Sequence, residues 1–346
     1  MKVGLLTYHH SVSYGATLQT YATYKLLEQL GHEVEIIDLR LEEKQSIFYK
    51  FAFSLKLYDT KRLWERCYPP LSKHYSDIES LQNATLDYDC IIVGSDQTWN
   101  PQISKNRRFA FFLDFGPRDI RRISFASSFG INSWPIEYQA DIPKIKSLLK
   151  RFHAISVRER EGQILLKDTF DTDAEKVLDP TLAFDDFAEL SGNITPNRKL
   201  ITFIMNRSTQ QLRRVSEFGA AYGKRPIMTS TIFPYKGFAY QYPPGIGQWL
   251  RNIGGADFVI IDSFHALVFC IKYKKPFAVI TPDNGKNSRL LELLRITELE
   301  YRFFNDENEH IPYQQLINET IDYNKVERLL NQEKEKTIEY LRKSLS

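Results

Sequence analysis

The chain has 346 residues, of which 42% are hydrophobic and 26% are charged, a composition typical of soluble globular proteins and unlike disordered, collagen-like or coiled-coil chains. Because single cores stop growing beyond about 250–300 residues, this length favours two domains. The 46 Lys and Arg residues nearly balance the 43 Asp and Glu residues, so the charge gives no support to a nucleic-acid-binding protein.

The first 40 residues predict one β-α-β unit. Residues 2–7 form a short apolar run, apolar side chains then recur at every fourth position from Leu18 to Leu30, and Gly31 ends this helical pattern. A second apolar run covers residues 34–38, so we expect two parallel strands joined by a right-handed helical crossover.

Residues 41–88 depart from this pattern and are interpreted as an insertion that mixes aromatic side chains with Lys and Arg. One interpretation is an amphipathic surface in peripheral contact with a membrane or a lipid-linked substrate. The other is a helical hairpin packed on the sheet, in which Lys stems lie beside the aromatic rings. Packing of this kind is the commoner use of such residues.

The alternation of strand and helix patterns then resumes and predicts an α/β fold with parallel sheets. Strand patterns in the first half occur at residues 90–93, 123–126, 154–157 and up to 178, and helical patterns occur at 136–152 and 161–167. A loop-rich stretch at 191–199 precedes further strand patterns at 200–205, 226–228, 258–261 and 277–280. We therefore expect two Rossmann-like domains, 1–190 and 191–346, and allow for the last helix to pack back on the first.

The cysteines and the hydropathy pattern predict a cytoplasmic protein. Cys67, Cys90 and Cys270 are odd in number and far apart, which favours reduced thiols over disulfides. The N-terminal apolar run meets polar Thr7 too early for a signal peptide, and no run of 18 apolar residues occurs.

Polar residues follow the predicted strands of the first domain, where ligands bind in open parallel sheets. Tyr14, Gly15 and Gln19 follow the first strand, with a single glycine, so the dinucleotide fingerprint and the Walker A loop are both missing. The residues after residue 93 offer donors, acceptors and an aromatic ring suited to a sugar, although the same pattern also makes an ordinary turn. They are Ser95, Asp96, Gln97, Trp99 and Asn100.

Arg158 and Glu159 follow the strand pattern at 154–157. A cation that leaves a buried strand either recognises an anion bidentately or pairs with a nearby carboxylate for structure. The sequence leaves both alternatives open.

The second domain places a histidine at a helix start. Asp262 or Ser263 is suited to cap a helix whose first turn contains His265, where backbone amides and the helix dipole favour a bound anion. The dipole opposes the imidazolium form, whereas a bound multiply charged anion favours it, as a general acid requires. The alternative is a half-buried histidine satisfied by a carbonyl group. Arg289, also at a predicted helix start, is a second candidate for anion binding.

Nine sequence blocks, taken in order, resemble the polysaccharide pyruvyl transferase family over nearly the whole chain. They are HHSVSYGATLQTYA, GHEVEIIDL, DCIIVGSDQTWNP, FFLDF, ISFASSFG, ISVRERE, VLDPTL, DFVIIDSFHALVF and KKPFAVI. The resemblance implies two Rossmann-like domains facing across a cleft, as in GT-B glycosyltransferases, with the active site in the cleft. It also implies transfer of pyruvate from phosphoenolpyruvate to a sugar as a cyclic ketal.

The resemblance carries two residue roles onto this sequence. An arginine and a histidine implicated in phosphoenolpyruvate binding and catalysis in the family correspond to Arg158 and His265. The chain departs from the family where Ala266 replaces a glycine common among members, and at the Gly-Gly pair 254–255.

The implied reaction needs cations or helix amides for a trianionic donor, and no metal or other cofactor. Our hypothesis assigns the general acid to His265, leaves Asp96, Glu159 and Asp262 as alternative bases, and lets Arg158 and Arg289 hold the donor. The expected acceptor is a hexose of a capsule or exopolysaccharide precursor, linked to a lipid or a nucleotide. The alternatives are a GT-B nucleotide-sugar glycosyltransferase and a non-catalytic protein that binds an anionic sugar.

Overall fold

The computed structural model describes residues 1–11, 13–41, 67, 69–230, 234–242, 244–282, 287–308 and 310–346. These residues form two compact units. Of the described residues, the first unit contains those up to 41 together with 69–184 and 331–346, and the second contains 67 and 185–330.

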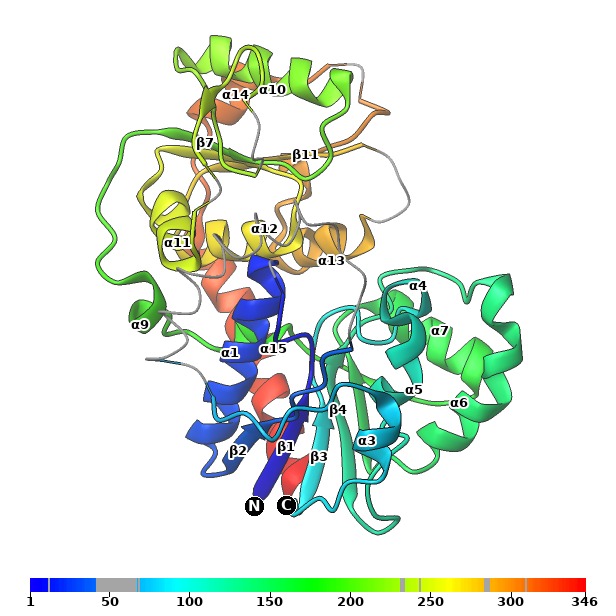
Figure 1. The fold of residues 1–346 in the computed structure, drawn as a ribbon. Coiled ribbons are helices and arrows are strands. Elements are labelled where there is room, and N and C mark those ends of the chain that lie inside the picture. Colours follow the sequence, from blue (N-terminus) through cyan, green and yellow to red (C-terminus); the bar gives the residue numbers. More distant parts are fainter. Residues whose placement is uncertain are drawn as a thin grey trace. The chain divides into compact units, whose positions relative to one another are not determined.

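The first unit is built on a six-stranded parallel sheet in the order β2-β1-β3-β4-β5-β6 (Figure 1). The strands are β1 (Lys2–Leu6), β2 (Glu33–Ile36), β3 (Cys90–Val93), β4 (Arg121–Ser127), β5 (Ala154–Val157) and β6 (Glu175–Lys176). The helices are α1 (Tyr14–Gln29), α3 (Ile78–Gln82), α4 (Pro101–Ser104), α5 (Arg108–Phe111), α6 (Ile142–Leu149), α7 (Arg160–Phe170) and α8 (Pro180–Ala183), with 3₁₀ turns at Lys105–Arg107 and Ile136–Asp141.

The second unit contains another six-stranded parallel sheet, in the order β12-β11-β10-β7-β8-β9. Its strands are β7 (Leu200–Phe203), β8 (Ile227–Met228), β9 (Ala239–Tyr240), β10 (Phe258–Ile261), β11 (Phe277–Ile280) and β12 (Phe303–Phe304). Its helices are α9 (Ala188–Ser191), α10 (Thr209–Tyr222), α11 (Ile246–Gly255), α12 (Phe264–Lys272), α13 (Ser288–Thr297) and α14 (Tyr313–Asn318), with a 3₁₀ turn at Glu300–Arg302.

The central strands are buried on both faces, which explains why they are continuous apolar runs rather than alternating ones. All four residues of β3 and all four of β10 are buried. The predicted β-α-β unit and the α/β class are therefore confirmed.

One predicted helix is divided in two. The pattern over residues 136–152 becomes a 3₁₀ turn followed by α6, and Pro143 stands in the first turn of α6. Proline is suited to that place because the first amides of a helix have no intrahelical acceptor. The helical periodicity alone did not show this break.

The end of the predicted insertion joins the first sheet. Ser72 N donates to Ile36 O at 2.8 Å, and Tyr75 N donates to Asp38 O at 2.8 Å, so residues 70–75 run beside the chain that leaves β2. Residues 42–66, on which the membrane and hairpin interpretations of the insertion mainly depend, lie outside the described residues.

The last helix, α15 (Tyr323–Leu345), contributes its C-terminal turns to the first unit. Leu178 N donates to Thr337 Oγ1 at 2.9 Å, and the Tyr340 hydroxyl donates to Ser124 O in β4 at 2.7 Å. Figure 1 shows these turns running beside the strands of the first sheet.

All three cysteines are described, and none forms a disulfide. Cys90 and Cys270 are buried, as expected for core thiols, and burial raises the pKa of Cys90 to about 12. Among the helices that the structure describes, none combines the length and apolar character that a membrane span requires.

Candidate active site

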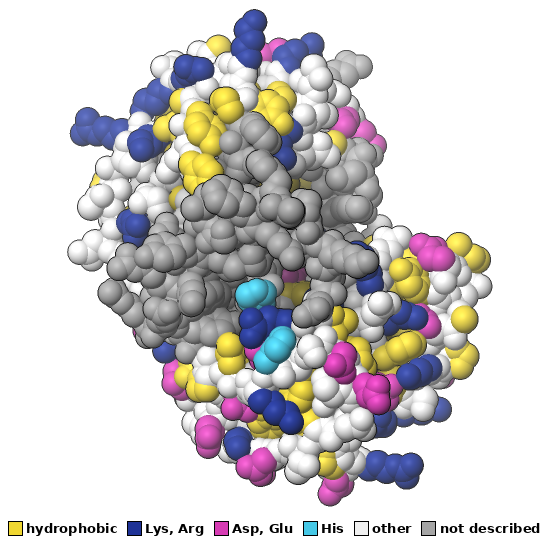
Figure 2. Space-filling view, viewed as in Figure 1, with side chains coloured by type: hydrophobic (Ala, Val, Ile, Leu, Met, Phe, Trp, Pro, Cys, Tyr) yellow, Lys and Arg dark blue, Asp and Glu magenta, His cyan; other side chains and the backbone are white. Residues whose placement is uncertain are grey.

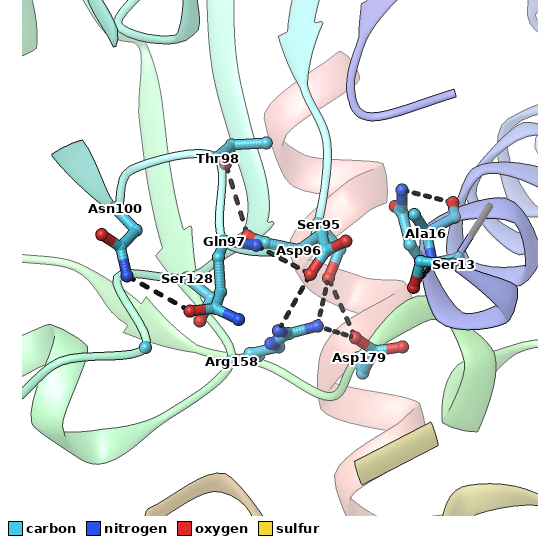
Figure 3. Close-up of polar contacts among 12 residues, drawn as sticks. Ser13, Ala16, Ser95, Asp96, Gln97, Thr98, Asn100, Ser128, Arg158 and Asp179 are labelled. Carbon is cyan, nitrogen blue, oxygen red and sulfur yellow. Dashed lines mark hydrogen bonds and ion pairs between the residues drawn. The ribbon is translucent and has the colours of Figure 1, made fainter. Parts of the chain in front are cut away.

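Arg158 follows β5 and lies in a buried cluster of acidic side chains (Figure 3). Its Nη1 donates to Asp179 Oδ2 at 2.6 Å and to Ser95 Oγ at 3.3 Å. Its Nη2 lies 3.6 Å from Asp96 Oδ1, and its Nε lies 3.7 Å from Glu159 Oε2. The sheet order brings these residues together because β3, β4, β5 and β6 are consecutive neighbours and end at one edge.

Asp179, which the sequence analysis did not select, is the main partner of Arg158. Its Oδ2 also accepts from Ser95 Oγ at 2.9 Å, and its Oδ1 accepts from Thr181 N at 2.9 Å. Asp179 caps α8, and Pro180 occupies the first turn of that helix. The sequence did contain a signal for Asp179: it is an acidic residue that directly follows the strand-like run ending at 178 and directly precedes a proline.

Glu159 supports a loop. Its Oε1 accepts from Ser128 Oγ at 2.8 Å and from Phe129 N at 3.0 Å, and its side chain is 2% exposed. A carboxylate held in this way is poorly placed to take a proton from a substrate.

Asp96 is the carboxylate of this cluster that reaches solvent, with 17% of its side chain exposed, whereas that of Asp179 is fully buried. Its backbone φ is 79°, in the left-handed region, and its Oδ1 accepts from Gln97 N at 2.9 Å. Backbone conformations of this kind are sparsely populated and gather at functional sites.

The charges around Arg158 bear on the two alternatives left open by the sequence. Burial alone would lower the pKa of Arg158, but the carboxylates of Asp179, Asp96 and Glu159 together raise it. One cation against three carboxylates gives the cluster a net negative charge, which repels a trianion such as phosphoenolpyruvate. This geometry favours the pairing alternative for Arg158.

Three predicted sugar-binding residues have structural contacts. Trp99 is fully buried, its Nε1 donates to Phe111 O at 2.9 Å, and its ring stacks on Phe112. Asn100 caps α4 through Gln102 N, and its Nδ2 donates to Gln97 Oε1 at 3.2 Å. Trp99 therefore packs in the core and offers no exposed ring to a sugar.

The predicted residues after β1 lie in the buried first turns of α1. Tyr14 and Gly15 open the helix, with Ser13 as its N-cap. Gln19 is fully buried, and its Nε2 donates to Thr7 Oγ1 at 2.8 Å, while Thr7 Oγ1 donates to Ser95 O at 3.0 Å. Gln19 thus links α1 to the loops after β1 and β3.

Asp262 follows β10 in the second unit and organises the loop after β7. It accepts from Met205 N at 2.7 Å, from Asn206 N at 2.8 Å and from Gln211 Nε2 at 3.3 Å. Burial raises its pKa, against the effect of these hydrogen bonds and of the nearby charge of Arg207. Its carboxylate is already bound to three donors, so it is also a poor choice of base.

His265 lies in the first turn of α12, as the sequence predicted, directly after the N-cap Ser263 and Phe264. The Ser263 side chain makes no capping bond to the helix, and the first helical bond is Leu267 N to Ser263 O at 3.0 Å. The backbone amides of the first three residues of α12 therefore have no acceptor within the helix. Their N–H groups point toward the carboxyl end of β10. His265 is 8% exposed.

Two arginines lie at the same edge of the second sheet. Arg207, which the sequence analysis missed, follows β7, and its Nη1 donates to Ser230 O at 3.3 Å, in the loop after β8. Arg289 is half-buried in the first turn of α13, the helix after β11. Arg207 was detectable as a cation a few residues after a buried strand.

The predicted site residues therefore divide between the two units. Ser95, Asp96, Arg158 and Glu159 come together in the first unit, whereas Asp262, Ser263, His265 and Arg289 belong to the second. Within the described residues, no group of three or more His, Cys, Asp or Glu side chains is arranged to hold a metal ion.

Solved structures share this fold at low sequence identity. The glycosyltransferase AviGT4, involved in avilamycin A biosynthesis, is 12% identical with a TM-score of 0.52, and the match covers 100% of this chain and 98% of that chain. A putative UDP-N-acetylglucosamine 2-epimerase from Listeria monocytogenes is 11% identical with a TM-score of 0.51, covering 96% and 90%. The chain has the two-domain α/β fold of GT-B glycosyltransferases, as expected.

No curated protein matches the sequence. The polysaccharide pyruvyl transferase family model matches residues 14–284, which include Arg158 and His265. Because this match extends over most of the chain, the protein is a transferase that belongs to the polysaccharide pyruvyl transferase family.

Proposed function

We propose that the protein transfers the pyruvyl group of phosphoenolpyruvate to two hydroxyls of a hexose in a polysaccharide precursor, forms a cyclic ketal and releases phosphate. Family membership supports the reaction class. The observation that carries the proposal is the placement of His265 in the first turn of α12, where β10 ends.

The donor phosphate is assigned to this end of the second sheet. The first turn of α12 favours an anion through the direction of its N–H groups and through the helix dipole. Arg207 and Arg289 add positive charge from the loop after β7 and from the start of α13. The donor site proposed here needs no metal.

His265 then acts as the general acid. It delivers a proton to the methylene carbon of phosphoenolpyruvate, which leaves an oxocarbenium centre at C2. A sugar hydroxyl attacks C2, the C2–O bond to phosphate breaks, and a second hydroxyl closes the ketal. Of the two hydroxyl protons, one balances the proton placed on carbon and the other leaves with phosphate.

Asp96 is the proposed base that accepts a hydroxyl proton. It is the carboxylate near Arg158 with solvent access, whereas Glu159 and Asp262 are held by loop donors. Arg158 is then a positioning residue, because its ion pairs with Asp179 and Asp96 fix the geometry at the end of β3.

Phosphate release from phosphoenolpyruvate, measured with a panel of lipid-linked and nucleotide-linked hexoses, tests the proposal. His265→Gln should lower turnover about 10²–10⁴-fold, the range that general acid catalysis contributes. Its melting temperature should still rise on adding phosphoenolpyruvate, because the amide can bind phosphate but cannot deliver a proton.

His310→Gln, which changes an exposed histidine of the same unit, is the matched control and should keep full turnover. Full turnover in His265→Gln would exclude the acid role. Release of a nucleoside diphosphate from a nucleotide sugar, with no phosphate from phosphoenolpyruvate, would instead identify a glycosyltransferase.

A further inference from the structure

The first unit carries another polar cluster, at the carboxyl ends of β1 and β2. We call it the Asp38 cluster, and it consists of His9, His10, Asp38, Arg40 and His74. Asp38 is buried, its Oδ1 lies 2.8 Å from His9 Nε2, and its Oδ2 pairs with Arg40 Nη2 and lies 3.4 Å from His74 Nδ1. None of these residues has a role in the reaction described above.

Backbone pairing fixes this arrangement although His74 is distant from Asp38 in sequence. Tyr75 N donates to Asp38 O at 2.8 Å, and Arg40 N donates to Tyr75 O at 3.0 Å. Asp38 N also donates to Ser72 Oγ at 2.9 Å. The strand-like segment at 70–75 therefore presents His74 beside Arg40 at the edge of the sheet.

The cluster gathers four basic side chains around a single carboxylate. The two ring nitrogens of His9 lie 3.2 Å from Thr7 O and 2.8 Å from Asp38 Oδ1. Burial would raise the pKa of Asp38, but hydrogen bonds from His9 and Arg40 hold it far below its usual range. One carboxylate thus pairs with the Arg40 guanidinium, and three histidines lie around it that add positive charge when they are protonated.

The cationic groups reach solvent whereas the carboxylate does not. The exposed fraction is 37% for the side chain of Arg40, 48% for His74 and 3% for Asp38. In Figure 2, histidine and basic side chains gather on the surface near the carboxyl ends of β1 and β2. An anion approaching this surface would meet Arg40 and His74 first.

His10 would respond to such an anion. Burial and the charges of Arg40, His9 and His74 lower the pKa of His10, whereas the charge of Asp38 raises it. A bound phosphate would oppose this shift and favour the imidazolium. The cluster can therefore gain a cation at His10 when a multiply charged anion binds.

We propose that the Asp38 cluster binds the phosphate that links the acceptor sugar to its carrier. The identification of the anion as part of the acceptor rests on the proposed function, because the donor phosphate is assigned to α12. Arg40 supplies a planar donor group suited to phosphate oxygens, and His74 and His10 supply further donors. Lipid-linked and nucleotide-linked sugars share this phosphate chemistry.

Calorimetric titration of the full chain with inorganic pyrophosphate tests binding independently of turnover. Arg40→Gln and His74→Gln should each weaken binding, and the loss for Arg40→Gln should be about tenfold because a charge-assisted contact is removed. Lys73→Gln is the matched control, since exposed Lys73 lies over the Tyr75 ring, 5.3 Å from its centroid, and outside the cluster. The affinity of Lys73→Gln for pyrophosphate should equal that of the wild type.

Separate titrations with phosphoenolpyruvate, UDP and farnesyl diphosphate distinguish the sources of the phosphate. Phosphoenolpyruvate affinity should be the same in Arg40→Gln and wild type, and tighter binding of UDP or of farnesyl diphosphate identifies the carrier. Unchanged pyrophosphate affinity in both variants, or a loss of phosphoenolpyruvate affinity instead, would overturn the proposal. If Arg40→Gln fails to fold, His74→Gln provides the comparison. These titrations measure binding alone, so they can be interpreted even if the protein does not turn over phosphoenolpyruvate.

Discussion

Arg158 has three carboxylate neighbours, and their geometry bears on what its charge does. A lysine at this position would keep the charge but could not reach Asp179, Ser95 and Asp96 together, because an ammonium lacks the planar fork of a guanidinium. A substitution that keeps the positive charge but changes the shape of the side chain therefore tests the role of Arg158.

Arg158→Lys should lower the free energy of unfolding by about 1.5–3 kcal/mol, the contribution of a hydrogen bond to a charged group. The half-saturating phosphoenolpyruvate concentration should change little. Urea unfolding and a donor titration measure the two quantities, with Arg160→Lys, an exposed neighbour, as the control. Unchanged stability with a raised half-saturating concentration would instead assign Arg158 to the donor site.

Asp38 predicts a pH dependence of stability. Its folded pKa lies below its unfolded value, so its contribution is fully present above the unfolded pKa and is lost as pH falls through the folded pKa. The stability difference between wild type and Asp38→Asn should therefore be about 1 kcal/mol smaller at pH 3 than at pH 6, because pH 3 is about one unit below the unfolded pKa.

Urea unfolding at the two pH values measures this difference. Asp87→Asn is the control, because Asp87 is 96% exposed and should contribute little at either pH. If wild type and Asp38→Asn differ in stability by the same amount at pH 3 and pH 6, the hydrogen bonds that Asp38 accepts from His9 and Arg40 do not favour its ionised form.

At the scale of elements, α15 stabilises a unit that is distant from it in sequence. Tyr340 is buried against β4, and its hydroxyl donates to Ser124 O, which also accepts from Ser156 Oγ at 2.9 Å. Removing the Tyr340 hydroxyl takes one side-chain donor away from this carbonyl. The expected loss is therefore that of a single hydrogen bond.

Tyr340→Phe should lower the stability of the first unit by about 1 kcal/mol. Hydrogen exchange of the amides in β4 and β5 should become faster, while that of β10 and β11 should not change, because these strands belong to the other unit. Tyr301→Phe, at an exposed tyrosine, is the control. Equal acceleration in both sheets would mean that α15 does not act on the first unit selectively.

At the scale of the whole molecule, the fold was more predictable than the site. The alternating runs gave the parallel α/β architecture, and the position after β10 gave His265 at a helix start. Trp99 is an example of a site residue that the sequence did not place correctly. It lies in a turn rich in polar residues and was expected to bind a sugar, but its ring packs in the core. The pattern of residues 41–88 likewise did not show that residues 70–75 extend the first sheet.

Local sequence patterns were enough to predict the central strands and which polar residues follow them, because apolar periodicity and helix capping act over a few neighbouring residues. The pairing of Arg158 with Asp179, and of His9 and His74 with Asp38, could be seen only in the folded chain. These pairs depend on which strands become neighbours in the sheet. Strand order is set by packing of the whole unit, so it cannot be predicted from local sequence patterns.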